Sequence, residues 1–235
     1  MKKIVTLAVA MLAFSAVAAL AIGPGPFFAR GGYYDGGWSA DAGNQMTLAA
    51  GIWTVAATSP MAAGYYEGKV ATSDWLESYP ASNQPIFISG PGDVVTWSFD
   101  TNTYADGWLP ATGIAYNDHA VASGMTFEVI GAAPETGSWG SGVAAVLNGD
   151  VWEVTIPIGT PGTYDVKFRK TGDWSINVGS DGYGTNANNA SYTTTIANEP
   201  MLFQFNQRTG RMRISTVGAT PTRSTTFGGL KAEYR

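Results

Sequence analysis

Apolar and polar residues alternate with a period of two through most of the chain. In VWEVTI, residues 151–156, the side chains of Trp152, Val154 and Ile156 fall on one face of an extended segment. YDVKFR, residues 164–169, alternates in the same way, and turn sequences such as GTPGT separate these runs. No amphipathic helix pattern is sustained beyond the N-terminal apolar run. The pattern therefore predicts an all-β fold of antiparallel β-sandwiches.

An internal repeat divides this strand pattern into two copies. Residues 36–55, GGWSADAGNQMTLAAGIWTV, and residues 137–154, GSWGSGVAAVLNGDVWEV, share the order Gly-x-Trp, Leu, turn and apolar-Trp-x-Val. Trp53 and Trp152 are 99 residues apart, as are Trp75 and Trp174. The last strands, VVTWSFDTNT and PMLFQFNQRTG, align with an offset of 106, so the second copy has seven extra residues. We place them in the Gly/Asn-rich loop over residues 180–191.

The repeat predicts two domains. Residues 22–105 are expected to form the first sandwich and residues 125–216 the second, joined over residues 106–124 by a linker or a packed connecting arm. Residues 217–235 are expected to be a C-terminal tail, either loose or acting as a sorting or docking strand. With no cysteine in the chain, each domain must be stabilised by its core rather than by disulfides.

The first residues are typical of a Sec-type signal peptide. Two lysines precede an uncharged apolar stretch that ends in small residues near Ala21, and a Gly-Pro-Gly-Pro segment follows. A membrane anchor is the competing interpretation, but the alanine content and these prolines argue against it. We expect residues 1–21 to be removed and the protein to be secreted, periplasmic or at the cell surface.

The loss of Lys2 and Lys3 would change the net charge from −5 to −7. Phosphate binding needs clustered basic residues, so a nucleic-acid role is not expected.

The ordered motifs of the two copies resemble a known family. Gly-x-Trp, apolar-Trp-x-Val, Tyr-x-x-Lys followed by Asp-Trp, and a last strand of the Phe-x-Phe-Asp/Asn-x-x-Thr type are similar to the immunoglobulin-like (E-set) starch-binding modules found beside pullulanases and in outer-membrane starch-binding proteins. The resemblance implies two tandem immunoglobulin-like sandwiches. It also implies an α-glucan lying on an exposed aromatic platform, with lysine or asparagine side chains bonding to sugar hydroxyls. Some relatives in that family are spacers without binding.

The residues that match the binding motif belong to both copies. They are Trp38, Lys69 and Trp75 in the first and Trp139, Lys167 and Trp174 in the second. A flat indole packs well on the C–H face of a sugar ring. The alternative for Trp75 and Trp174 is that each plugs one end of its sandwich, and for the lysines that they are ordinary solvated charges. Trp53 and Trp152, in phase with valines, are predicted to be core residues.

The extra loop of the second copy offers one further candidate. Tyr183, in SDGYGTN, could clamp a ligand, whereas Asp181 and asparagine carbonyls could instead bind Ca²⁺. With a single carboxylate in the loop, the Ca²⁺ alternative has little support. We therefore predict no metal site and no cofactor.

Catalytic patterns have little support in this sequence. Glycoside hydrolysis needs two facing carboxyl groups, but the acidic residues are scattered over the polar phases of strands. The chain has a single histidine, His119, in the connecting segment. We therefore predict a secreted, non-catalytic carbohydrate-binding protein whose partner is a polysaccharide, most simply an α-glucan. The alternative is a structural or self-assembling envelope or extracellular matrix protein with protein partners, because tandem sandwiches can pair through strand edges.

Overall fold

The computed structural model describes residues 22–217. The predicted signal peptide, residues 1–21, and residues 218–235 of the predicted tail lie outside the described residues. Within residues 22–217 every regular element is a β-strand except for one 3₁₀ turn, η1 (Pro134–Thr136), so the all-β expectation is confirmed for this part of the chain. No helix among the described residues is long and apolar enough to cross a membrane.

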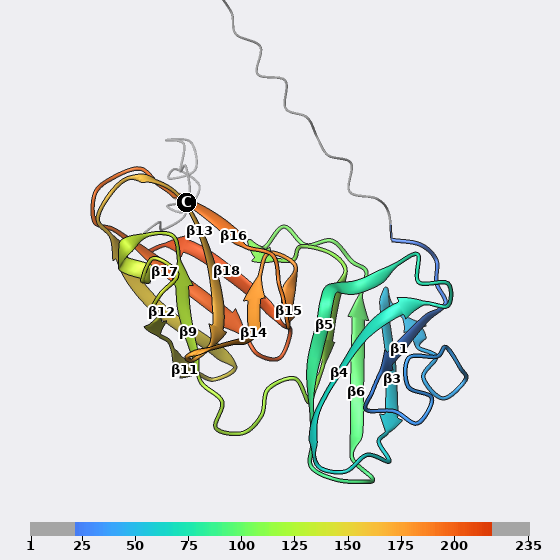
Figure 1. Cartoon of the computed structure of the whole chain (residues 1–235). Coiled ribbons are helices and arrows are strands. Elements are labelled where there is room, and N and C mark those ends of the chain that lie inside the picture. The colour runs from blue at the N-terminus through green and yellow to red at the C-terminus, as the bar shows by residue number, and fades with distance from the viewer. Residues whose placement is uncertain (1–21, 218–235) are drawn as a thin grey trace, which may run out of the picture.

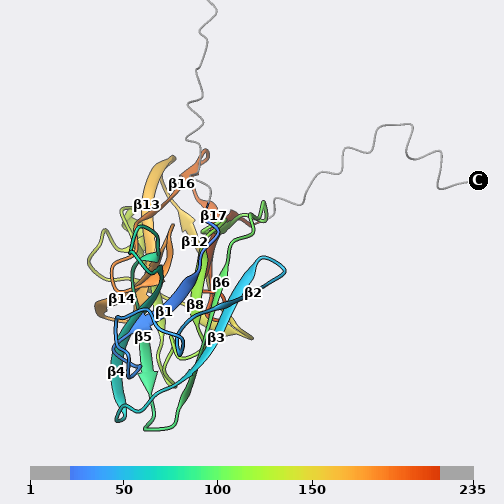
Figure 2. The same ribbon diagram turned by 90° about the vertical axis from the view of Figure 1, so that its right-hand side faces the viewer.

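The first half of the structure contains two antiparallel sheets that face each other (Figures 1 and 2). The smaller sheet has the order β1-β4-β5, formed by β1 (Phe27–Gly31), β4 (Gly64–Thr72) and β5 (Ser78–Ile88). The larger sheet has the order β2-β3-β6-β8, formed by β2 (Thr47–Ala49), β3 (Ile52–Thr58), β6 (Val94–Asp100) and β8 (Ile114–Asn117). A buried cluster that includes Phe27, Trp97 and Phe99 fills the space between them.

The second half repeats this arrangement (Figure 1). One sheet has the order β10-β9-β13-β14-β15, with β16 also pairing with β13. Its strands are β9 (Phe127–Gly131), β10 (Val143–Ala144), β13 (Gly162–Lys170), β14 (Asp173–Gly179), β15 (Gly182–Gly184) and β16 (Ala190–Thr194). The facing sheet has the order β11-β12-β17-β18-β7 and is formed by β7 (Trp108–Leu109), β11 (Val146–Asn148), β12 (Val151–Ile158), β17 (Glu199–Asn206) and β18 (Arg211–Thr216). A second cluster, with Phe127, Phe168 and Phe205, lies between the two sheets.

The period-two stretches form strands as predicted. VWEVTI lies in β12 and YDVKFR in β13, with Val166 and Phe168 fully buried on the inner face. Trp53 and Trp152 are only 9% and 7% exposed and belong to the two clusters, which confirms the prediction that they are core residues. Alternation predicts these positions because successive side chains of a strand point to opposite faces.

The connecting segment, residues 106–124, is packed into both halves. It supplies β7 to the sheet of β18 in the second half and β8 to the sheet of β6 in the first half. Arg211 of β18 holds it by a buried guanidinium that donates to both Asp106 carboxylate oxygens and to the Trp108 and Pro110 carbonyls. The two halves therefore share a segment with fixed contacts on each side.

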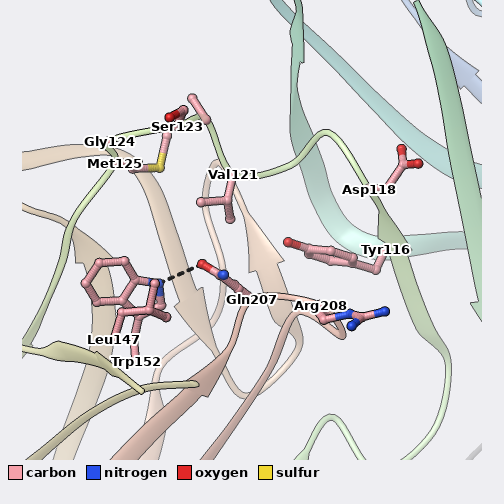
Figure 3. Close-up of a pocket in the computed structure, with 11 residues that line it drawn as sticks. Tyr116, Asp118, Val121, Ser123, Gly124, Met125, Leu147, Trp152, Gln207 and Arg208 are labelled. Carbon is pink, nitrogen blue, oxygen red and sulfur yellow. Dashed lines mark hydrogen bonds between the residues drawn. The ribbon is translucent and has the colours of Figure 1, made fainter. Parts of the chain in front are cut away.

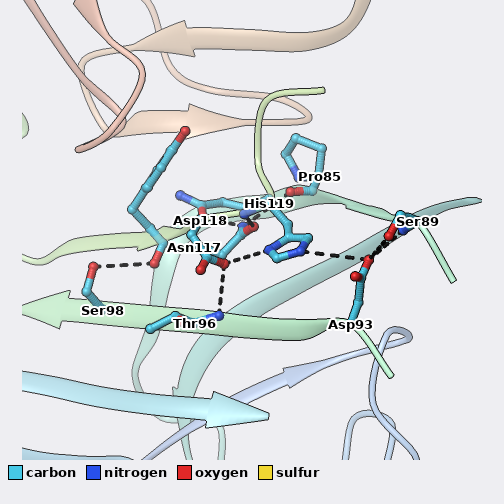
Figure 4. Close-up of polar contacts among 10 residues, drawn as sticks. Pro85, Ser89, Asp93, Thr96, Ser98, Asn117, Asp118 and His119 are labelled. Atoms are coloured by element: carbon cyan, nitrogen blue, oxygen red, sulfur yellow. Dashed lines mark hydrogen bonds and ion pairs between the residues drawn. The ribbon is translucent and has the colours of Figure 1, made fainter. Parts of the chain in front are cut away.

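The histidine of this segment is part of a polar cluster (Figure 4). His119 Nδ1 lies 2.7 Å from Asp118 Oδ1, and His119 Nε2 lies 3.9 Å from Asp93 Oδ2. Asp118 Oδ1 also accepts a bond from the Thr96 backbone N–H, and the Phe87 N–H donates to the His119 carbonyl. These contacts attach the connecting segment to β5 and β6 of the first half.

Candidate functional site

Two of the predicted tryptophans lie together in each half. The ring centroids of Trp38 and Trp75 are 6.1 Å apart with an interplanar angle of 39°. Those of Trp139 and Trp174 are 6.2 Å apart with the same angle of 39°. The members of each pair are more than 30 residues apart in the sequence. Tertiary structure thus forms the same aromatic pair twice.

The pairs face solvent rather than the cores. Trp38, Trp75 and Trp174 are 40%, 43% and 44% exposed, and Trp139 is half-buried. None of the four belongs to the buried clusters between the sheets. The alternative in which Trp75 and Trp174 plug the ends of the sandwiches therefore does not describe their position.

A buried arginine supports each pair from below. The guanidinium carbon of Arg30 lies 4.3 Å from the ring centroid of Trp75, and that of Arg169 lies 4.5 Å from the ring centroid of Trp174. These distances are within the range of cation–π contacts. Arg30 and Arg169 are 1% and 6% exposed. Each arginine thus restricts the movement of the exposed indole above it.

The two arginines come from different strands, and only one of them is paired with a carboxylate. Arg169, on β13, forms a buried ion pair with Glu128 on β9, with 2.6 Å between Nε and Oε1. Arg30, on β1, has one hydrogen bond, from Nη1 to the Trp38 carbonyl at 3.4 Å, and its Nε and Nη2 atoms have no partner among the described residues. Burial lowers the pKa of Arg30, and the charge of Asp74 partly opposes this shift.

The aspartate of the Asp-Trp motif makes the same backbone hydrogen bond in both copies. Asp74 Oδ1 accepts a hydrogen bond from the Leu76 backbone N–H at 3.1 Å, and Asp173 Oδ1 accepts one from the Ser175 N–H at 2.8 Å. Each aspartate thus bonds to the backbone two residues on, in an Asx turn that contains the tryptophan. The repeated aspartate therefore fixes the turn that presents the indole.

The carboxylates of these turns are stabilised in the charged form. A hydrogen bond from the Thr72 hydroxyl, at 2.7 Å, and the Leu76 N–H lower the pKa of Asp74. The Lys170 ammonium, 2.8 Å from Asp173, and the Ser175 N–H lower the pKa of Asp173 to about 2. Both turns are consequently charged at neutral pH.

Left-handed backbone conformations also position the rings. Trp75 and Trp139 each have φ of 64°, a region that non-glycine residues rarely adopt. The Trp75 N–H donates to Thr72 O at 3.2 Å and the Trp139 N–H to Gly131 O at 2.9 Å. One strained tryptophan thus belongs to each pair, and backbone strain of this kind concentrates at functional sites.

The predicted lysines share a sheet face with the arginines. Lys69 is the direct ladder partner of Arg30, and Lys167 lies two residues before Arg169 on β13. Burial lowers the pKa of both lysines. The Lys69 ammonium donates to the Ala81 carbonyl at 2.9 Å, so in this structure it bonds to the protein itself. The lysines therefore lie on the same sheet face as the arginines that contact Trp75 and Trp174.

Tyr183 differs from the expectation of an exposed clamp. It is 1% exposed, its hydroxyl donates to Ala120 O at 2.8 Å, and its ring stacks on Phe205 at 5.5 Å. The loop turns inward there because β15 pairs with β14, which carries Tyr183 into the core cluster. Asp181 instead bonds to the backbone N–H and side-chain amide of Asn188. Among residues 22–217 no group of three or more His, Asp or Glu side chains could hold a metal ion.

Two hollows at the junction of the halves were not predicted from the sequence. One, of about 300 Å³, includes Tyr116 and Val121 of the connecting segment, together with Trp152 and Gln207 of the second half, whose side chains share a 3.0 Å hydrogen bond (Figure 3). The other, of about 570 Å³, lies between β4 and β5 on one side and β13 and β14 on the other. Sequence periodicity carries no signal for either, because both depend on how the halves are packed.

No family model matches the chain, and no curated protein matches it. Among solved structures, the chain is similar to SusF from Bacteroides thetaiotaomicron, with 14% sequence identity and a TM-score of 0.30. The match covers 82% of this chain and 48% of SusF, so the chain spans about half the length of that neighbour.

Proposed function

We propose that this protein binds a neutral polysaccharide without catalysis, through the Trp38–Trp75 and Trp139–Trp174 pairs. The observation that carries the proposal is the recurrence of one exposed aromatic geometry, a 39° tilt at 6.1 and 6.2 Å, in two copies whose sequences otherwise differ. Tryptophans needed only for packing would be buried, as Trp53 is in the first half and Trp152 in the second.

The chemistry of the pairs suits a sugar chain. Indole rings offer large apolar faces at a low cost in rotamer entropy, and the buried arginines and Asx turns hold them in place before a ligand arrives. The two rings of each pair are tilted by 39° and so do not present one flat surface. Because a curved chain needs no flat surface, we assign the ligand to the α-glucans. We propose that Lys69 and Lys167 bond to sugar hydroxyls at the edge of each site, Lys69 by exchanging its bond to the Ala81 carbonyl for one to the ligand.

The finer features of the fold belong to the same proposal. We assign the two pairs of sheets to tandem immunoglobulin-like sandwiches that begin after a cleaved signal peptide, with the mature protein secreted, periplasmic or at the cell surface. The support is the equivalent order of strands around each core cluster and the shared tryptophan geometry.

Affinity electrophoresis of residues 22–235 tests the proposal. Native gels are cast with amylopectin, pullulan, a β-glucan or no polysaccharide, and mobility is compared with that of a non-binding standard. We expect retardation in the α-glucan gels and its loss in the double variant Trp75→Ala/Trp174→Ala. The matched control is Trp108→Ala, because Trp108 also lies against an arginine, Arg213 at 4.9 Å, but is not in either pair.

Two results of this experiment would contradict different parts of the proposal. Retention of binding by the double variant would reject the tryptophan pairs as the site. Free migration of the unmodified chain in every gel would reject carbohydrate binding itself.

A second candidate function, self-assembly, is favoured by two edge strands. β2 and β11 are edge strands at equivalent positions of the two halves, and all their residues are exposed, including Leu48 at 50% and Val146 at 70%. An exposed apolar edge strand can pair with another chain. Light scattering over a range of protein concentrations tests this function. We expect the chain to associate at high concentration and Val146→Lys to weaken that association. A strict monomer at high concentration would exclude it.

A further inference from the structure

The larger hollow at the junction is a cleft with walls from both halves. From the first half, Tyr65 and Glu67 of β4 and Phe87 of β5 line it. From the second half, Lys170 of β13, Ser175 of β14 and Thr185 line it. Its volume of about 570 Å³ is within the range of roughly 300 to 1,000 Å³ that is usual for small-molecule sites.

Direct contacts between the halves hold these walls in position. The Thr185 backbone N–H donates to Asn83 O across the junction at 2.8 Å, and β15 lies against β5. The Asn83 side-chain amide donates to Glu67 Oε2 at 2.8 Å, which connects this contact to the wall of the cleft. The cleft is therefore formed before any ligand binds.

The lining combines an aromatic surface with hydroxyl groups. Tyr65 is 45% exposed, and its ring packs edge-on against Phe87 with centroids 5.6 Å apart. Ser175 and Thr185, two residues with hydroxyl side chains, line the opposite wall. Apolar ring faces flanked by a few hydrogen-bonding groups suit a ligand with C–H faces and a rim of hydroxyls.

The charged groups of the cleft already have hydrogen-bonding partners. Glu67 accepts bonds from Asn83 and from the Tyr65 hydroxyl, the latter at 3.0 Å. The Lys170 ammonium bonds to Asp173 at 2.8 Å. A charged ligand would have to displace one of these partners, so the lining favours a neutral one.

The cleft begins next to the second tryptophan pair. Trp174 and Ser175 are consecutive, so their Cα atoms are about 3.8 Å apart, and Asp173 bonds to both the turn of Trp174 and Lys170 of the cleft. Ser175 of the cleft wall is thus the next residue in the chain after Trp174.

We infer that this cleft is a second subsite that extends the Trp139–Trp174 site and takes further rings of the same neutral oligosaccharide, with Tyr65 of the first half as its aromatic floor. The inference rests on the proposed function. With this subsite, the second site is a composite of both halves and is longer than the first. The second copy has Thr163 at the position of Tyr65, and the Thr163 hydroxyl is bonded to Thr193, so the second copy offers no equivalent aromatic floor to the first site.

Binding of short and long ligands tests the inference. Isothermal titration of residues 22–235 is carried out with maltotriose and with maltoheptaose, for the unmodified chain and for Tyr65→Ala and Ser175→Phe. Tyr65→Ala removes the aromatic floor, and Ser175→Phe fills the cleft from an exposed position without changing Trp174. Tyr104→Ala is the matched control, because Tyr104 is an exposed tyrosine of the first half outside the cleft.

We expect maltoheptaose to bind more tightly than maltotriose, and each cleft variant to weaken maltoheptaose binding roughly tenfold, which corresponds to a loss of about 1.4 kcal/mol. Maltotriose binding should be unchanged in both variants and in Tyr104→Ala. Unchanged maltoheptaose binding in both cleft variants, or equal affinity of the unmodified chain for the two ligands, overturns the subsite while the tryptophan pairs remain as the site. Absence of binding to both ligands overturns the proposed function and the subsite together.

Discussion

Glu128 and Arg169 are direct partners in the ladder between β9 and β13, and their side chains form a buried ion pair beneath Trp174. In the first half, Phe28 takes the position of Glu128, and the arginine under Trp75 is Arg30, two residues further along the same strand. The same support for an exposed indole is thus built with a carboxylate in one copy and without one in the other.

This difference predicts that removing Arg169 destabilises the protein more than removing Arg30. Arg169→Met should lower the free energy of unfolding by about 3 kcal/mol, because it leaves Glu128 buried without its charge partner. Arg30→Met should change it by no more than about 1 kcal/mol, since it removes a buried charge that has no paired carboxylate. Urea unfolding of the two variants measures both values. Equal losses would contradict the contrast.

The left-handed conformation of Trp139 predicts an unusual preference for glycine. Trp139→Gly should be more stable than Trp139→Ala by about 1 kcal/mol, because glycine adopts positive φ without a steric cost. Thermal or urea unfolding of the two variants gives the comparison.

Trp174 is the matched control for this preference. It lies in β14 without a positive φ, so there the order should be reversed, with the alanine variant more stable than the glycine variant. The same order at both positions would mean that the backbone at Trp139 is not strained.

Acid should weaken the turn that presents Trp174. The pKa of Asp173 is lowered to about 2 in the folded protein, whereas an aspartate in the unfolded chain has a pKa of about 3.9. Its stabilising effect is therefore complete above about pH 4 and is lost as the pH falls toward about 2. The side chain is 39% exposed, so solvent screens its contacts and the effect should be small.

Asp173→Asn provides the measurement, because asparagine can still accept the Ser175 N–H bond but does not ionise. The difference in urea midpoint between the unmodified chain and this variant should be larger at pH 6 than at pH 2. Asp150→Asn, which removes a carboxylate from an exposed pair with Arg208, is the control for loss of an acidic group. A difference that does not change with pH would refute the role of Asp173.

Tyr183 should contribute to stability and not to binding. Tyr183→Phe removes the hydroxyl that donates to Ala120 O and leaves that carbonyl without this partner, which should lower the free energy of unfolding by about 1 kcal/mol. Retardation in α-glucan gels should be unchanged at a temperature where the variant is folded. Weaker retardation with unaltered stability would restore Tyr183 as a ligand contact.

The sequence alone determined the strands, the two cores and the repeat. Trp152, Val166 and Phe168 were predictable as inward-facing residues because strand alternation is a local property of the backbone. The Asp-Trp motif was also visible, since an aspartate that bonds two residues ahead acts within its own turn.

Only the tertiary structure decided where the candidate site residues lie and which of them meet. The pairing of Trp38 with Trp75 and of Trp139 with Trp174, the burial of Tyr183 and the cleft at Tyr65 all depend on segments far apart in the chain. The arginine beneath each pair comes from β1 in one copy and β13 in the other, so aligning the two repeats does not find it. Periodicity reports which face of a strand is apolar, but packing between sheets and between halves decides which side chains meet.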